Sequence, residues 1–153
     1  MAADPRSPPG AVLFACNFNR VRSPMAEALL KRLVGDRIYV DSCGVRYPPL
    51  DPEVMVEVDP FVTAVMAEIG CDLSRHRVKT FDDLEDSSFD LVISLTSESE
   101  DRAVEMARGR ASEVEYWPIP DPTLAEGSRE ARLSAYREVR DALERRIAAR
   151  FGA

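Results

Sequence analysis

The sequence predicts a single-domain α/β fold in which helices cover both faces of a parallel β-sheet. The chain has 153 residues, the length of one domain, and 45% of them are hydrophobic, enough for a substantial core. Short apolar runs typical of buried strands alternate along it with amphipathic stretches typical of helices. Strands that are joined through helices pair in parallel and carry those helices on both faces.

The first half of the chain is expected to supply two strand–helix pairs. In order, these are a strand at 11–15, a helix at 23–34, a strand at 37–41 and a helix at 61–69. Pro24 is tolerated in a first helical turn, and Gly35 and Gly70 suit helix C-terminal ends. Residues 45–59 contain three prolines and several acidic residues. They predict a long ordered loop, either functional or a solvated connection.

The second half repeats the alternation. The expected elements are a strand at 89–95, a helix at 97–107, a strand at 114–117 and a long final helix. Ser97 and Glu100 have the spacing of a capping box at the start of the third helix. One apolar stripe marks the buried face of the final helix: Leu133, Tyr136, Val139, Leu143 and Ile147.

Composition excludes several classes of function. The formal net charge is −7, the wrong sign for a general nucleic-acid or anionic-membrane binder, so neither partner is expected. The three cysteines form no C-x-x-C pair and there is one histidine, so no metal site is expected. Residues 1–10 read as a flexible tail without the apolar segment of a signal peptide, and no stretch approaches a membrane span. The expected location is the cytoplasm.

The residues best suited to binding and catalysis follow the first strand. Cys16 comes directly after it, five residues intervene, and Arg22-Ser23-Pro24 open the next helix. Residues 16–37 contain five basic and two acidic residues, although the chain as a whole is acidic. In an open parallel sheet, ligands bind beyond the carboxyl ends of the strands and near helix N-termini. The pattern therefore predicts an anion site here.

Each part of this segment has a use in phosphate chemistry. Two arginines and a helix N-terminus favour the thiolate form of Cys16, and the loop N–H groups can surround a phosphate-sized anion. The planar guanidinium of Arg22 can hold two phosphoryl oxygens, and Ser23 can donate to the sulfur. Taken separately, Cys16 also suits a small buried residue and Arg22-Ser23 a polar helix start. Their combination favours the functional interpretation.

Residues 16–27 resemble the active-site signature of the low-molecular-weight protein tyrosine phosphatases, which is C-x5-R-S followed by Pro and an Ala-Glu pair. The resemblance continues in Asp41-Ser-Cys-Gly44, in residues 70–77, in the third strand and in Asp121-Pro122. It covers nearly the whole chain after the tail. It implies one domain over 11–153, a three-layer α/β/α sandwich with a four-stranded parallel sheet in the order 2-1-3-4.

The resemblance also implies a metal-free and cofactor-free reaction in two steps. Cys16 is the expected nucleophile, Arg22 the stabiliser of the phosphoryl oxygens, and Asp121 the general acid and then base. Asn19, Ser23 and His76 are expected to support the loop. The expected phosphate-binding residues are Asn17, Phe18, Asn19, Arg20, Val21, Arg22 and Ser23. The substrate is then a phosphorylated protein or a small aryl phosphate, and the product is inorganic phosphate.

Three positions depart from the family pattern. Phe18 stands where the family usually has Gly, so its ring narrows the pocket or stacks on a substrate. Val21 replaces a frequent second cysteine, which removes protection of Cys16 by a vicinal disulfide. Thr123-Leu124 replaces the aromatic pair that walls the phosphotyrosine cleft, which questions tyrosine specificity and leaves the chemistry intact.

Two alternatives to a phosphatase remain open. Thioredoxin-coupled arsenate reductases share the fold and the loop, but they use resolving cysteines near the end of the third strand. Residues 94–101 contain none, and Cys43 and Cys71 are expected in the core. The other alternative is a non-catalytic module that binds a phosphorylated partner, against which the retention of Cys16, Arg22 and Asp121 argues.

Overall fold

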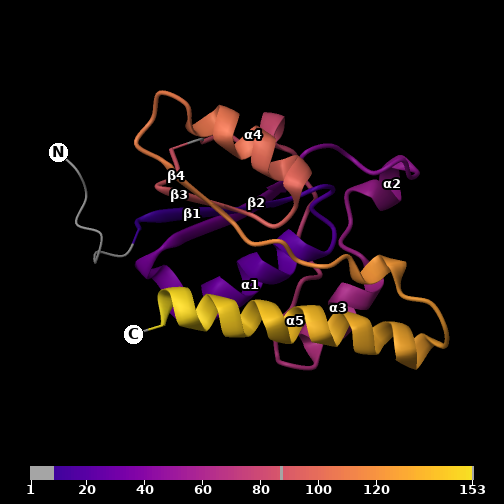
Figure 1. The fold of residues 1–153 in the computed structure, drawn as a ribbon. Helices are drawn as coiled ribbons and strands as arrows, with labels where there is room; N and C mark the ends of the chain where they lie inside the picture. Colours follow the sequence, from indigo (N-terminus) through magenta and orange to yellow (C-terminus); the bar gives the residue numbers. More distant parts are fainter. Residues whose placement is uncertain (1–8, 87, 153) are drawn as a thin grey trace.

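The computed structural model describes residues 9–86 and 88–152 and contains one four-stranded sheet (Figure 1). The strands are β1 (Ala11–Cys16), β2 (Tyr39–Gly44), β3 (Leu91–Ser94) and β4 (Glu113–Tyr116). Their order across the sheet is β2-β1-β3-β4, and every neighbouring pair is parallel. The predicted α/β class, parallel pairing and strand order are therefore confirmed.

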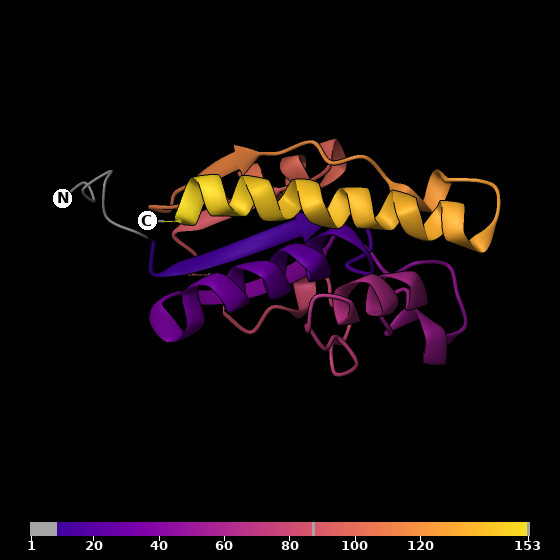
Figure 2. The same ribbon diagram turned by 90° about the horizontal axis from the view of Figure 1, so that it is seen from below.

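Helices lie on both faces of this sheet and complete the three layers. They are α1 (Arg22–Val34), α2 (Pro52–Met55), α3 (Pro60–Ala67), α4 (Ser97–Ala107) and α5 (Arg129–Phe151). Figure 1 shows α4 on one face and α1 with α5 on the other, and Figure 2 shows α5 running alongside α1. The loops that follow the carboxyl ends of β1, β3 and β4 gather at one edge of the sheet, because all strands point the same way.

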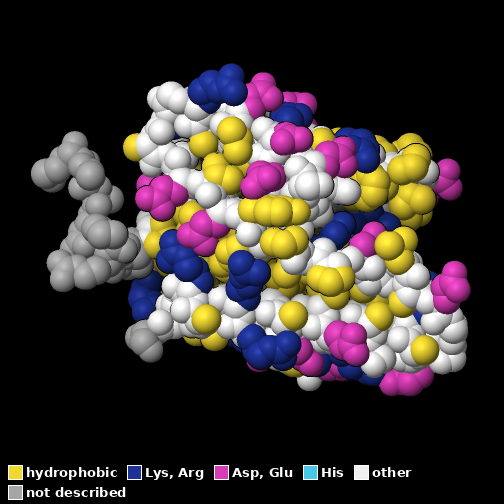
Figure 3. Space-filling view, viewed as in Figure 1, with side chains coloured by type: hydrophobic (Ala, Val, Ile, Leu, Met, Phe, Trp, Pro, Cys, Tyr) yellow, Lys and Arg dark blue, Asp and Glu magenta, His cyan; other side chains and the backbone are white. Residues whose placement is uncertain are grey.

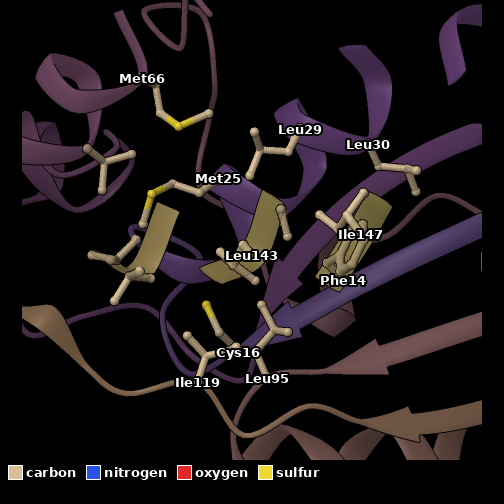
Figure 4. Packing of buried hydrophobic residues seen from close by; sticks show 14 of the residues in the cluster. Phe14, Cys16, Met25, Leu29, Leu30, Met66, Leu95, Ile119, Leu143 and Ile147 are labelled. Atoms are coloured by element: carbon tan, nitrogen blue, oxygen red, sulfur yellow. The ribbon is translucent and has the colours of Figure 1, made fainter. Parts of the chain in front are cut away.

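The alternation of side chains along β1 divides the core between the two faces. Val12, Phe14 and Cys16 belong to the larger cluster, which lies against α1 and α5 (Figure 4). Leu13 and Ala15 belong to a smaller cluster beneath α4. Successive strand residues point to opposite faces, so a strand buried on both sides reads as a continuous apolar run. The predicted stripe of α5 is buried in the larger cluster.

Several predicted boundaries shift by one or two residues, and two local assignments change. A 3-10 turn at Gly35–Arg37 delays the second strand to Tyr39, and this strand then continues to Gly44. The expected loop at 45–59 includes the short helix α2. The predicted capping box at Ser97 is wrong. Thr96 is the N-cap, because its hydroxyl accepts the N–H of Ser99 at 3.1 Å.

The expected tail at 1–10 falls almost wholly outside the described residues, which begin at residue 9. Among the described helices, none is both long enough and apolar enough to cross a membrane.

Candidate active site

Residues 17–21 form a loop between the end of β1 and the start of α1, and its shape is set by contact with β2. The carbonyl of Asn17 accepts the N–H groups of Val45 and Arg46, at 2.8 and 3.1 Å. At Gly44 a Cβ atom would come within 2.7–2.9 Å of the loop backbone, so only glycine fits there. In the described part of the chain, the N–H groups of residues 17–21 donate to no protein acceptor. They are available to an anion.

Cys16 ends β1 at the base of this loop. Its side chain lies at the edge of the larger core cluster, beside Leu95 and Ile119 (Figure 4), and is only 2% exposed. The hydroxyl of Ser23, on the first turn of α1, lies 2.9 Å from Cys16 Sγ. A hydroxyl at this distance can donate to a thiolate and stabilise its charge. The sulfur is therefore buried on its core side and has the Ser23 hydroxyl as a hydrogen-bond partner.

Asn19 holds the loop from below. Its backbone has φ of +57°, in the left-handed region that favours glycine and asparagine, and its side chain is fully buried. The amide nitrogen donates to the hydroxyls of Ser23 and Ser42, at 2.8 and 2.9 Å. The amide oxygen accepts the N–H of Lys79 at 3.1 Å and the Nε2–H of His76 at 3.0 Å. Its four partners fix the strained backbone in place.

The network continues beneath the loop to α1. Ser42 donates to Glu27 Oε1 at 2.5 Å, and Lys31 donates to Glu27 Oε2 at 2.5 Å. His76 Nδ1 lies 3.8 Å from Glu27 Oε1. Burial lowers the pKa of His76 below its usual value, although Glu27 opposes the shift. A neutral imidazole with its proton on Nε2 suits the bond to the Asn19 carbonyl.

A cavity of about 240 Å³ opens above the loop. Cys16, Phe18, Arg22 and Asp121 all line it. Figure 3 shows a hollow with basic side chains set back between a largely hydrophobic lobe around α2 and the surface of the helices below. Arg22 donates from one guanidinium nitrogen to the carbonyl of Ile119 at 3.0 Å, which fixes the arginine relative to the segment that carries Asp121.

The walls of the cavity come from two further segments and from the loop itself. Pro48, Pro49 and Leu50 line one side, so part of the predicted 45–59 loop belongs to the site. Phe18 lines it as well, with the guanidinium of Arg46 over its ring at 5.2 Å. These contributions make the upper cavity largely apolar.

Asp121 lies at the start of a 3-10 turn, Pro122–Leu124, and Thr123 lines the cavity beside it. One carboxylate oxygen of Asp121 accepts both the N–H and the hydroxyl of Thr123, at 2.9 and 2.7 Å. These bonds orient the carboxyl group within the cavity wall.

The structure separates the predicted site residues into three sets. Six of them line the cavity: Cys16, Phe18, Arg20, Val21, Arg22 and Asp121. Asn19, Ser23 and His76 lie beneath the loop instead. The side chain of Asn17 borders a neighbouring cavity, and its buried Oδ1 has no partner within the described residues.

Sequence reasoning missed Glu27 and Ser42 as members of the network, although both fall within stretches that resemble the family. It also missed Asp59, which lines the cavity, accepts the hydroxyl of Tyr136 at 3.0 Å and so ties the site to α5. No local motif marks Asp59, because only the fold brings these residues together.

The other cysteines lie away from the cavity. Cys43 is fully buried in the smaller cluster under α4, on the opposite face of the sheet from Cys16, and burial raises the pKa of its thiol. Cys71 is buried in the larger cluster and borders a groove on the far side of α1. Within residues 9–86 and 88–152, no three His, Cys, Asp or Glu side chains gather as a metal site requires.

Comparisons with known proteins give two kinds of relative. Residues 11–151 match the family "low molecular weight phosphotyrosine protein phosphatase". An arsenate reductase of Halalkalibacterium halodurans is 32% identical over 89% of this chain and 91% of its own length. A solved arsenate reductase in the phosphate binding state is 28% identical, with a TM-score of 0.69 over 91% of this chain and 94% of that one. A tyrosine phosphatase of Erwinia amylovora shares the fold at 19% identity, with a TM-score of 0.71 over 96% and 94% of the two chains.

Proposed function

The chain belongs to the low molecular weight phosphotyrosine protein phosphatase family, and from that premise we propose that it hydrolyses phosphate monoesters through a phosphocysteine intermediate. The observation that carries the proposal is the convergence of Cys16, Arg22 and Asp121 on one cavity, with the Ser23 hydroxyl 2.9 Å from the sulfur. These are a nucleophile, an anion holder and a proton donor within reach of one bound group.

In the first step, the thiolate of Cys16 attacks phosphorus while the bond to the leaving oxygen breaks. The protonated carboxyl of Asp121 donates its proton to that oxygen. The free N–H groups of the loop and the guanidinium of Arg22 hold the equatorial phosphoryl oxygens. The Ser23 hydroxyl stabilises the thiolate before attack.

In the second step, water attacks phosphorus and the sulfur–phosphorus bond breaks. Asp121, now a carboxylate, accepts a proton from the water, and inorganic phosphate leaves. The Ser23 hydroxyl again stabilises Cys16, this time as the departing thiolate. The reaction needs a free thiol and all three cysteines are unpaired, so we place the protein in a reducing compartment, the cytoplasm.

The proposed substrate class is aryl phosphate, including phosphotyrosine of a protein. The cavity offers an aromatic face from Phe18, which the cation of Arg46 holds in place, and apolar faces from Pro48 and Leu50. These surfaces suit a flat apolar leaving group. In this proposal the substrate ring contacts an aromatic side chain of the loop, Phe18, rather than one from the segment after Asp121.

The test is hydrolysis of two aryl phosphates, one with an activated phenol as leaving group and one with a poor leaving group. We expect Cys16→Ser to abolish both activities. We expect Asp121→Ala to lower the rate of hydrolysis of the substrate with the poor leaving group by about 10²-fold or more. The rate for the activated substrate should fall much less, because its phenolate leaves without needing a proton. The matched control is Glu126→Ala. Glu126 is another acidic residue of the same surface segment, and it lies outside the cavity lining.

Three outcomes would contradict the proposal. Activity that survives Cys16→Ser removes the nucleophile, and equal losses for both leaving groups remove Asp121 from its acid role. A wild-type protein that binds phosphotyrosine peptide and turns over no aryl phosphate would favour the non-catalytic binding module.

Arsenate reduction is the second candidate, favoured by the names of relatives up to 32% identical to this chain. That reaction oxidises two thiols for each arsenate reduced to arsenite. Cys43 lies on the opposite face of the sheet from Cys16, and Cys71 borders a different groove, so neither is placed to resolve an adduct on Cys16. A reductase built on this chain therefore needs its second thiol from another molecule.

The two candidates are separated by one pair of assays on the same preparation. Arsenite formation is measured with a small external thiol present, and phosphate release is measured from the aryl phosphate. Cys43→Ala and Cys71→Ala serve as variants in both. Arsenite formation without external thiol that disappears in either variant would show an internal resolving cysteine and contradict the placement above.

A further inference from the structure

A groove of about 590 Å³ lies behind the catalytic loop, on the side of α1 away from the cavity. One side is one face of α1, formed by residues 24, 27, 28, 31 and 32 at the i, i+3, i+4, i+7, i+8 spacing. The other side is the segment from Gly70 to Arg77. The groove is larger than the catalytic cavity and its size is that of a pocket for a small ligand.

The groove is basic in a chain that is acidic overall. Lys31, Arg32, Arg75 and Arg77 line it, against Glu27 and Asp72. Lys31 pairs with Glu27, and Arg32 pairs with Glu144 of α5. Arg75 and Arg77 are exposed, and neither forms an ion pair within the described part of the chain. Two guanidinium groups on one wall are thus left to bind an anion.

The acidic residues in the groove offset these charges only in part, through the interaction of Asp72 with Arg75. The carboxylate of Asp72 accepts the N–H of Ser74 at 2.9 Å, within its own turn. Glu27 is turned inward, to Ser42 and Lys31. Arg75 and Arg77 therefore leave the lining of the groove with a surplus of positive charge.

Two residues of the groove also belong to the network beneath the catalytic loop. His76 lines the groove and donates to Asn19 at 3.0 Å, and Glu27 lines it and accepts from Ser42 at 2.5 Å. The groove and the loop thus lie on opposite ends of the same hydrogen-bonded chain. A charge placed in the groove acts on His76 directly, and on Glu27 by competing for Lys31.

We propose that this groove is a second anion site, which binds an oligophosphate through Arg75 and Arg77 and is linked to the catalytic loop through His76 and Glu27. The volume suits a ligand larger than a single phosphate, and separate guanidinium groups suit a ligand with more than one phosphoryl group. The proposal holds whether the reaction at Cys16 is phosphate hydrolysis or arsenate reduction.

The single histidine makes the test specific, because its ring resonances in NMR spectra have one source. The charged groups near His76 are Glu27 from α1, Asp41 from β2, and Lys79 from its own segment. Bound triphosphate adds negative charge and draws Lys31 from Glu27. Both effects favour the protonated ring, so the titration midpoint of His76 should rise by about half a pH unit.

The experiment titrates the full chain with inorganic triphosphate and follows both heat of binding and the His76 ring. We expect Arg75→Gln and Arg77→Gln each to weaken binding by about 10-fold and to reduce the His76 shift, because each removes one charge-assisted contact. The matched control is Arg145→Gln, which removes the same charge from an exposed position on α5 outside the groove. It should change the affinity by less than about 2-fold, the effect of net charge alone.

An adenine nucleotide triphosphate in a parallel titration reports whether a base adds contacts in the groove, which would appear as tighter binding than inorganic triphosphate. Binding with equal affinity in all three variants would place the anion outside the groove and overturn the proposal. The absence of binding at millimolar triphosphate, or binding that leaves the His76 midpoint in place, would also overturn it. Far-ultraviolet circular dichroism of each variant checks that the fold is kept.

Discussion

The floor and the walls of the catalytic cavity are built in different ways. We define the floor as the loop 16–23 with the side chains that hold it from below, and the walls as residues 48–50 and Thr123, which border the cavity without a part in the proposed reaction. Asn19, Ser23 and Ser42 of the floor are completely buried and bonded to one another. In the walls, Leu50 is 43% exposed, and Pro49 and Thr123 are exposed as well.

This difference divides the work of the site. The floor must place a sulfur, N–H groups and a guanidinium within fractions of an ångström, and a connected buried network gives that precision. The walls contact the variable part of a substrate, and exposed side chains can change with little loss of stability. The chemistry therefore depends on the floor, together with Asp121 as the acid, and selectivity depends on the walls. Three predictions test this division, from the largest expected effect to the smallest.

The largest effect is expected for Asn19→Ala. The change removes four hydrogen bonds, two of them buried and two part-buried, and places alanine at a positive φ. We expect the free energy of unfolding to fall by about 2–4 kcal/mol and turnover to fall with it. Denaturant unfolding and aryl phosphate kinetics measure the two effects.

Asn17→Ala is the matched control in the same loop, since the buried Oδ1 of Asn17 has no partner in the described chain. It should destabilise the protein by less than about 1 kcal/mol. Equal destabilisation by the two variants would show that the network beneath the loop is not what holds the floor.

An intermediate effect is expected from pH, through His76. Its pKa is lowered in the folded protein by burial, so as pH falls below about 6.5 the unfolded chain takes up a proton before the folded one does. The free energy of unfolding should therefore fall as pH drops from about 6.5 toward the lowered pKa. Unfolding curves between pH 8 and pH 5 measure this.

The variant His76→Gln removes the titrating group and leaves every other ionisable residue in place. Its free energy of unfolding should depend less on pH over the same range. A pH dependence identical to that of the wild type would mean that His76 does not couple the floor to proton uptake.

The smallest effect on stability is expected in the walls. Pro49→Ala and Leu50→Ala should each change the free energy of unfolding by less than about 1 kcal/mol, because both residues line the cavity from exposed positions. KM for bulky aryl phosphates should rise while that for a small phosphate ester stays the same. The control is Val104→Ala, which truncates an exposed apolar side chain on α4, away from the cavity. It should alter neither the stability nor the KM for bulky aryl phosphates. A large loss of kcat in the wall variants would contradict the division.

The sequence could predict those features that depend on patterns local to one stretch of the chain. The strand–helix alternation sufficed for the fold class, because buried parallel strands read as apolar runs such as 11–15. The loop from Cys16 to Ser23 was recognisable because its chemistry requires residue types at fixed spacing along the chain.

The rest depends on contacts between distant segments. Asp59 and Pro48 border the cavity only because the 45–59 segment folds back over the loop, where Asp59 N–H donates to the Arg20 carbonyl at 3.0 Å. The cap of α4 was misassigned by one residue because Thr96, Ser97 and Ser99 are all good capping types. Only backbone geometry selects Thr96 among them.

The central claim is that Cys16 carries the phosphoryl group during turnover. Rapid acid quench of the wild type with an activated aryl phosphate, followed by mass spectrometry of its peptides, tests this most directly. We predict that one phosphoryl group appears on Cys16, that it forms as fast as the phenol is released, and that Cys16→Ser neither turns over nor acquires it in that time. Turnover with no phosphoryl group on Cys16, or with the group on another residue, would contradict the account.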